Sequence, residues 1–180
     1  MAKAIRLAIA VVVALAAVVG VLLFVQSRDK SQVDATSSSS GGPGRLLPDQ
    51  GDAHTPPPPG FRFATDPPAS GPHAPAAVNA DARPLTRDQL LHALELGDVA
   101  LVYSGYTGQL QVLRKIQDDV SGPFDPALAA TGQMVVLDRR PGTKGVIALA
   151  WRRMLQVPSV NDPRLHDFSD TWLGRGAGAQ

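Results

Sequence analysis

The longest apolar run of the chain covers residues 7–25 and reads LAIAVVVALAAVVGVLLFV, without a charged residue. A helix rises about 1.5 Å per residue, so a helix of this length would cross the hydrocarbon core of a bilayer, which is roughly 30 Å thick. Lys3 and Arg6 precede the run, as in a secretory signal peptide. The apolar core of such a peptide has about 7 to 15 residues and ends in a small-x-small cleavage site. The pattern therefore predicts an uncleaved transmembrane helix, with a cleaved signal peptide as the alternative.

Basic residues flank this run, two on each side: Lys3, Arg6, Arg28 and Lys30. The positive-inside bias is thus nearly balanced, but long domains cross the membrane largely regardless of charge, and short basic tails stay inside. We expect residues 1–6 to be a cytoplasmic tail and the rest of the chain to be extracytoplasmic. The predicted partners of this single-pass protein of the cell membrane are the lipid bilayer, through residues 7–25, and an unidentified extracytoplasmic or cell-envelope component.

Residues 26–59 are rich in Ser, Gly and Pro, with four consecutive serines at 37–40 and four consecutive prolines at 56–59. A segment with so few apolar residues buries too little surface to offset the entropy of ordering. We therefore expect a disordered linker over this range, and we expect His54 within it to be solvated.

After the linker, the pattern predicts one α+β domain over residues 60–176, with a small mixed sheet and about three helices, and then a flexible tail over residues 177–180. Thr86 and Gln89 have the spacing of a capping box that opens a helix. Gly97 follows the apolar residues of this helix, in the position where glycine commonly ends one.

Residues 99–103 read VALVY, a continuous apolar run of strand length that is typical of a buried central strand. The other predicted elements are a weak edge strand at 61–64, a helix with apolar residues at 110, 113, 116 and 120, a hairpin of two strands at 134–137 and 146–151, and a helix over about 163–173.

Composition excludes several function classes. Residues 60–180 contain twelve Lys and Arg and twelve Asp and Glu, so the domain is formally neutral and lacks the basic surface that nucleic-acid binding requires. The chain contains no cysteine, which excludes disulfides, thiol nucleophiles, iron–sulfur clusters and cysteine-ligated zinc.

The candidate chemistry lies on the first predicted helix. His92 and Glu95 are three residues apart and lie away from the leucine stripe of that helix, a spacing that occurs in carboxylate–histidine metal ligation. His73 lies in a proline-bounded turn that can approach the same face. We expect a candidate metal site of His73, His92 and Glu95 for copper or zinc, or an acid–base group. The alternative is structural: the two histidines bond backbone carbonyls and hold the turn against the helix.

No other residue has a comparable pattern. Ser70 is close to His73 in the sequence, but the chain has no G-x-S-x-G motif and no identified third member of a triad. His166, beside Asp167, is expected on the surface. No catalytic residue is predicted, and no cofactor is assigned beyond the possible copper or zinc.

Residues 66–73 read DPPASGPH and residues 92–97 read HALELG. These motifs resemble a bacterial family known as domain of unknown function 3105, whose members typically read DPPTSGPH and HxLEHG. Ala150, Trp151 and residues 168–176 are similar to later parts of the family pattern, so the resemblance covers about residues 61 to 176. It implies an exported protein with one N-terminal anchor.

The chain departs from the family pattern at one position of chemical interest. Leu96 stands where the family has a second helix histidine, four residues after His92. Because an i, i+4 histidine pair forms a good metal half-site, any metal role that the resemblance implies is weaker for this chain. The terminal GPE of the family is also absent, and residues 176–178 read GAG.

Three functions remain open at this point. The first is a membrane-anchored extracytoplasmic interaction or structural domain without catalysis. The second is a metal-binding domain or metalloenzyme that uses His73, His92 and Glu95. The third is a degenerate copy whose relatives retain the missing histidine, in which case Leu96→His would restore metal affinity.

Overall fold

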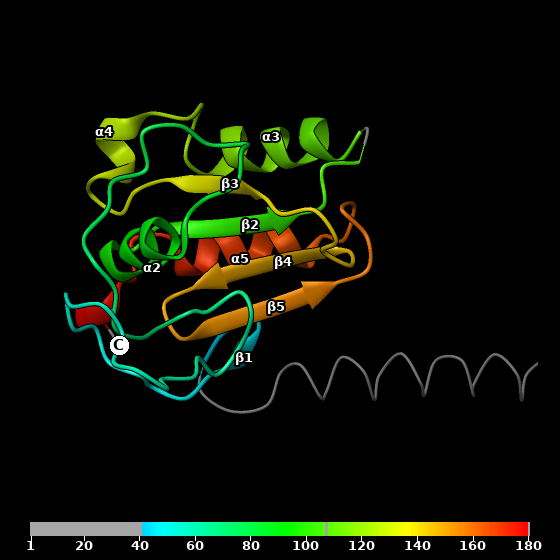
Figure 1. Ribbon diagram of the computed structural model, residues 1–180. Coiled ribbons are helices and arrows are strands. Elements are labelled where there is room, and N and C mark those ends of the chain that lie inside the picture. The colour runs from blue at the N-terminus through cyan, green and yellow to red at the C-terminus, as the bar shows by residue number, and fades with distance from the viewer. Residues whose placement is uncertain (1–40, 107, 180) are drawn as a thin grey trace, which may run out of the picture. The chain divides into compact units, whose positions relative to one another are not determined.

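The computed structural model describes residues 41–106 and 108–179, which fold around a five-stranded mixed sheet (Figure 1). The class is α+β, as the sequence predicts. The described helices and strands follow one another along the chain as β1 (Arg45–Leu46), α2 (Arg87–Leu96), β2 (Val99–Tyr103), α3 (Gln109–Val120), α4 (Pro126–Ala129), β3 (Val135–Arg139), β4 (Val146–Ala150), β5 (Arg153–Val157), α5 (Arg164–Trp172) and the 3₁₀-helix η1 (Ala177–Ala179).

The strands lie in the order β1-β5-β4-β2-β3. β2 pairs with β3 in parallel and with β4 in antiparallel orientation, so it separates the two strands that the sequence predicts as a hairpin. That prediction is wrong, because the apolar run of β2 forms hydrogen bonds along both of its edges. β4 instead forms a hairpin with β5, a strand that the sequence analysis did not predict.

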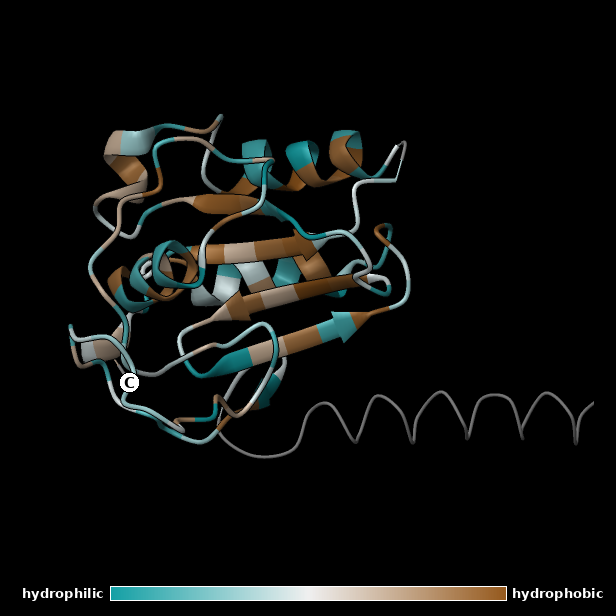
Figure 2. Ribbon diagram, in the orientation of Figure 1, coloured by the Kyte–Doolittle hydropathy of each residue, from teal (hydrophilic) through white to brown (hydrophobic). Residues whose placement is uncertain are grey.

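The sheet separates two apolar cores, one on each face. The leucines of α2 pack on Ala100, Val102 and Leu149, whereas α3 and α5 pack on the alternate residues Val99 and Leu101 of the other face. Figure 2 shows the consequence for sequence pattern: the central strands are predominantly apolar, and the three helices alternate between apolar and polar residues. This is the pattern expected for a sheet that is covered on both sides.

The three longest helices confirm the helices predicted from periodicity. Thr86 and Gln89 form both hydrogen bonds of a capping box at the start of α2, and Gly97 ends the helix with a φ of 123°. The short helix α4 was not predicted, so the described part of the chain has four α-helices instead of about three.

The N-terminal part of the domain differs from the prediction. Residues 61–64 form no strand; the edge strand is β1, which pairs with β5, and Leu47 beside it is buried. Residues 41–59 are therefore part of the described fold, and ordered chain begins before residue 60. The physical reason is that three residues, 45–47, are sufficient to pair a sheet edge and bury one leucine in an otherwise polar segment.

The predicted transmembrane helix at residues 7–25 and the linker residues 26–40 lie outside the described residues. Within the described ranges, no helix combines the length and the hydropathy that crossing a bilayer requires.

Asp98 is a fully buried carboxylic acid between α2 and β2. Its Oδ1 accepts a hydrogen bond of 2.8 Å from the Met134 N–H, and its Oδ2 has no hydrogen-bond partner within the described structure. Desolvation by burial raises the pKa of Asp98 from 3.8 to about 8, and the Met134 hydrogen bond opposes this only in part. The folded state therefore keeps a proton on Asp98 that the unfolded state releases above about pH 4.

This difference predicts that the free energy of unfolding falls between about pH 4 and pH 8, by up to about 1.4 kcal/mol per pH unit, since the folded state binds the additional proton. Asp98→Asn should flatten this slope, because Asn keeps the acceptor for Met134 and does not titrate. Urea unfolding at several pH values measures the slope, with Asp118→Asn on the exposed side of α3 as the control. Equal slopes for the wild type and Asp98→Asn would contradict the assignment.

Candidate metal centre

His73 is held in a buried turn. The segment from Pro67 to His73 is buried throughout, and the Arg152 N–H donates to Ala69 O, which ties the turn to the β4–β5 connection. His73 is fully buried, and its Nδ1 lies 2.9 Å from Gly71 O. Because a carbonyl oxygen only accepts, Nδ1 carries the proton, and the lone pair of the neutral ring is on Nε2.

Helix α2 places His92 and Glu95 beside this turn. Their i, i+3 spacing puts both side chains on the face of the helix that turns away from the leucine core. Glu95 Oε2 lies 3.0 Å from His73 Nε2 and 3.5 Å from His92 Nδ1. The three residues predicted from the sequence as a metal site are therefore brought together.

A fourth residue, His54, joins this cluster and was not predicted from the sequence. Its Nε2 lies 2.8 Å from Glu95 Oε2 and 3.1 Å from Oε1, and its ring centroid lies 5.4 Å from that of His73. His54 is exposed, as expected, with 48% of its side chain open to solvent, but its contact with Glu95 makes it a member of the cluster, which the sequence did not predict. The one sequence feature that could have indicated His54 as a site residue is that the chain has only four histidines. Its proline-rich surroundings instead favour an exposed linker.

The four side chains have the geometry of a metal site. One ligand atom from each of His54, His73, His92 and Glu95 can be chosen so that all lie within 4.8 Å of one another. The ligands of a tetrahedral zinc ion, at about 2.0–2.1 Å from the metal, lie about 3.3 Å apart. The distances from Glu95 Oε2 to the three nitrogens bracket this value, and a central ion would draw the donor atoms, which lie within 4.8 Å of one another, closer together.

The polar atoms of the cluster are incompletely satisfied within the described structure. His73 Nε2 and His92 Nδ1 are both buried without a hydrogen-bond partner. The 3.0 Å approach of His73 Nε2 to Glu95 is short enough for an ion pair, but its angle is not that of a hydrogen bond. A buried ring nitrogen whose lone pair faces other donor atoms is the arrangement that a metal ion satisfies.

Other residues considered in the sequence lie apart from this chemistry. The Ser70 hydroxyl donates to Pro48 O and accepts from the Gln50 N–H, which is a structural role. His166 is exposed on α5, the helix that covers the opposite face of the sheet. Leu96 offers no donor atom, and with His92 and small apolar residues it lines a cavity of about 70 Å³.

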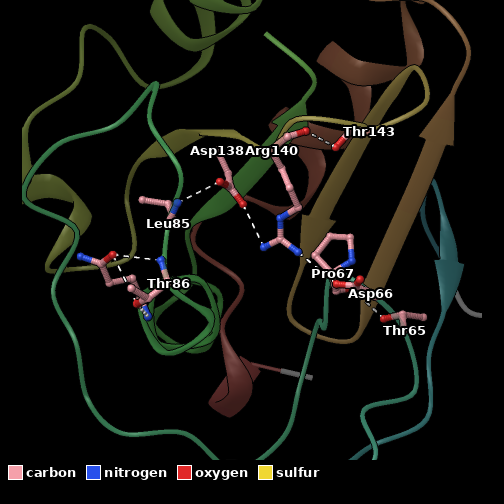
Figure 3. A network of polar contacts seen from close by, with 9 residues as sticks. Thr65, Asp66, Pro67, Leu85, Thr86, Asp138, Arg140 and Thr143 are labelled. Atoms are coloured by element: carbon pink, nitrogen blue, oxygen red, sulfur yellow. Dashed lines mark hydrogen bonds and ion pairs between the residues drawn. The ribbon is translucent and has the colours of Figure 1, made fainter.

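A buried carboxylate holds the start of α2 (Figure 3). Asp138, at the end of β3, accepts a hydrogen bond of 3.0 Å from the Leu85 N–H, next to the N-cap, and one of 3.2 Å from Arg140. The other side of the Arg140 guanidinium pairs with Asp66 at 3.1 Å. Desolvation raises the pKa of Asp138 even though Leu85 and Arg140 both favour its charged form. Asp138 thus positions the helix that carries His92 and Glu95.

Together these features define a small α+β domain with a cluster of three histidines and one glutamate at the junction of a loop, a turn and a helix. The chain belongs to the family described as Protein of unknown function (DUF3105), whose family model matches residues 54–179. This match confirms the resemblance drawn from the DPPASGPH and HALELG motifs. Comparison with the curated proteins and with the solved structures finds no match.

The two carboxylates that contact Arg140 differ in burial and provide a matched pair of substitutions. Asp138 is fully buried, whereas the side chain of Asp66 is 92% exposed. Asp138→Ala should lower the free energy of unfolding by about 2–4 kcal/mol, because it leaves the Leu85 N–H without an acceptor and Arg140 without its buried partner. Asp66→Ala should lower it by less than about 1 kcal/mol. Urea unfolding of both variants measures the difference, and equal effects would contradict the positioning role of Asp138.

Proposed function

We propose that the domain binds one divalent transition-metal ion, copper or zinc, through His54, His73, His92 and Glu95. The observation that supports this most directly is the convergence of four donor side chains from three separate segments, with two ring nitrogens that are buried and lack hydrogen-bond partners. Three imidazole nitrogens and one carboxylate oxygen form a donor set that suits both ions.

The charge of the cluster supports the same proposal. With neutral imidazoles, Glu95 leaves one negative charge beside three ring nitrogens, and this environment favours a cation at the centre. His73 also has the outer hydrogen bond that is typical of histidine ligands, since its Nδ1–H donates to Gly71 O and orients the ring.

The proposed role is metal binding within an extracytoplasmic interaction or structural domain, and no reaction is assigned to it. His54 supplies the fourth donor, so this chain does not need a histidine at Leu96 to complete a four-ligand set. The hypothesis of a degenerate copy that has lost its metal site therefore loses its main support.

Metal binding is tested by titrating the full-length chain, purified in detergent, with Zn²⁺ and Cu²⁺ in a calorimeter. We expect one ion per chain for the wild type, and an affinity reduced at least about 10- to 100-fold in His92→Ala, because one ligand is lost. His166→Ala is the matched control, since it removes the one histidine outside the cluster, and its affinity should equal that of the wild type. Absence of heat with the wild type, or equal affinity of all three proteins, would overturn the proposal.

A second proposal concerns the residues outside the described structure. We propose that residues 7–25 anchor the chain in the cell membrane with the domain on the extracytoplasmic side, on the basis of the uninterrupted apolar run. The full-length chain should then stay with the membranes after alkaline carbonate extraction, and a variant that lacks residues 7–25 should not. Recovery of the intact full-length chain in the soluble fraction would contradict the anchor.

A further inference from the structure

We propose that His54 is the exchangeable ligand of the metal centre, and that its displacement opens one coordination position for an external electron-pair donor. This inference rests on the proposed function. It adds which of the four ligands leaves.

The four ligands differ in how firmly the fold holds them. The exposed fraction of the side chain is 0% for His73, 20% for His92 and 15% for Glu95, but 48% for His54. His92 and Glu95 are on a helix packed against the sheet, and His73 ends a segment, residues 67–73, that is buried throughout. His54 is the only one of the four whose side chain is largely open to solvent.

The segment around His54 is an exposed loop whose two ends are joined by hydrogen bonds. The Gln50 side chain donates to Arg62 O and accepts from the Ala64 N–H, which joins the two ends of the loop. Backbone hydrogen bonds to Gly51 O and Ala53 O attach the loop to the His73 turn just before His54.

Beyond His54, the described backbone hydrogen bonds of the loop are internal. They join Thr55 to Ala53 and Phe61 to Pro58. Nearly all residues from 51 to 60 are exposed. The His54 ring can therefore swing away from Glu95 without breaking a backbone contact to the helix or the sheet.

The three ligands that remain form a recognised type of open site. Two histidines and one glutamate hold the zinc ion in one class of catalytic site, where the fourth position is left to water or substrate. In this domain His54 occupies the position of that fourth ligand. Exchange is a simple substitution: the lone pair of the incoming donor would form a bond to the metal, the bond from His54 Nε2 would break, and His54 would leave as a neutral imidazole.

The experiment uses Co²⁺ as the probe, because its visible absorption reports the number and kind of its ligands. In the full-length chain in detergent, His54→Gly should bind Co²⁺ within about 10-fold of the wild-type affinity, whereas His92→Gly, on the helix, should lose about 100-fold or more. Millimolar imidazole added to Co²⁺-loaded His54→Gly should restore the wild-type spectrum. Thermal unfolding in EDTA should show that both variants are folded.

A second arm measures the size of ligand that the open position admits. N-acetyl-histidine amide has the size of a histidine presented by another protein, whereas free imidazole represents a small ligand. Restoration by both shows an opening that admits a protein side chain, and restoration by imidazole alone shows an opening that admits small molecules only; either result supports the inference.

Two results would overturn the inference while the proposed function stands: Co²⁺ affinity in His54→Gly as low as in His92→Gly, or no spectral change with either ligand. Failure of the wild-type chain to bind Co²⁺, Zn²⁺ or Cu²⁺ would overturn both.

Discussion

A single carboxylate oxygen, Glu95 Oε2, faces imidazole nitrogens from three separate stretches of the chain, at distances of 2.8, 3.0 and 3.5 Å. The exposed loop with His54, the buried turn with His73 and helix α2 meet at this point. Glu95 brings a negative charge among these rings. The metal ion that we propose at this point would supply the balancing charge and would bond the buried ring nitrogens.

The position of Glu95 depends in turn on how both ends of α2 are held. At the start, the capping box and the Asp138–Leu85 hydrogen bond hold the first turn. At the end, the backbone of Leu96 lies so close to Gly132 and Gly176 that a Cβ at either glycine would overlap it. The 3.6-residue repeat then places His92 and Glu95 toward the turn while the leucines enter the core.

Much of this arrangement was predictable because it is local. The capping box, Gly97 and the leucine stripe predict α2, and the i, i+3 spacing predicts that His92 and Glu95 share a face. The β4–β5 hairpin was missed because its two-residue turn contains Arg152 at a φ of 55°, where a glycine or asparagine would have given a signal. The insertion of β2 between β3 and β4 depends on long-range pairing that no local pattern contains.

His54 is the residue of the site that the sequence did not predict. A segment of low hydrophobicity is expected to be disordered when burial is the only source of order. Here the loop is ordered by polar contacts instead, through the Gln50 hydrogen bonds at its base and the His54–Glu95 contact at its tip. The residues that His54 contacts, His73 and Glu95, lie about twenty and forty residues further along the chain, so the composition of the segment does not predict these contacts. Polar contacts with little burial hold His54, and this distinguishes it from His73, His92 and Glu95, whose side chains are more deeply buried.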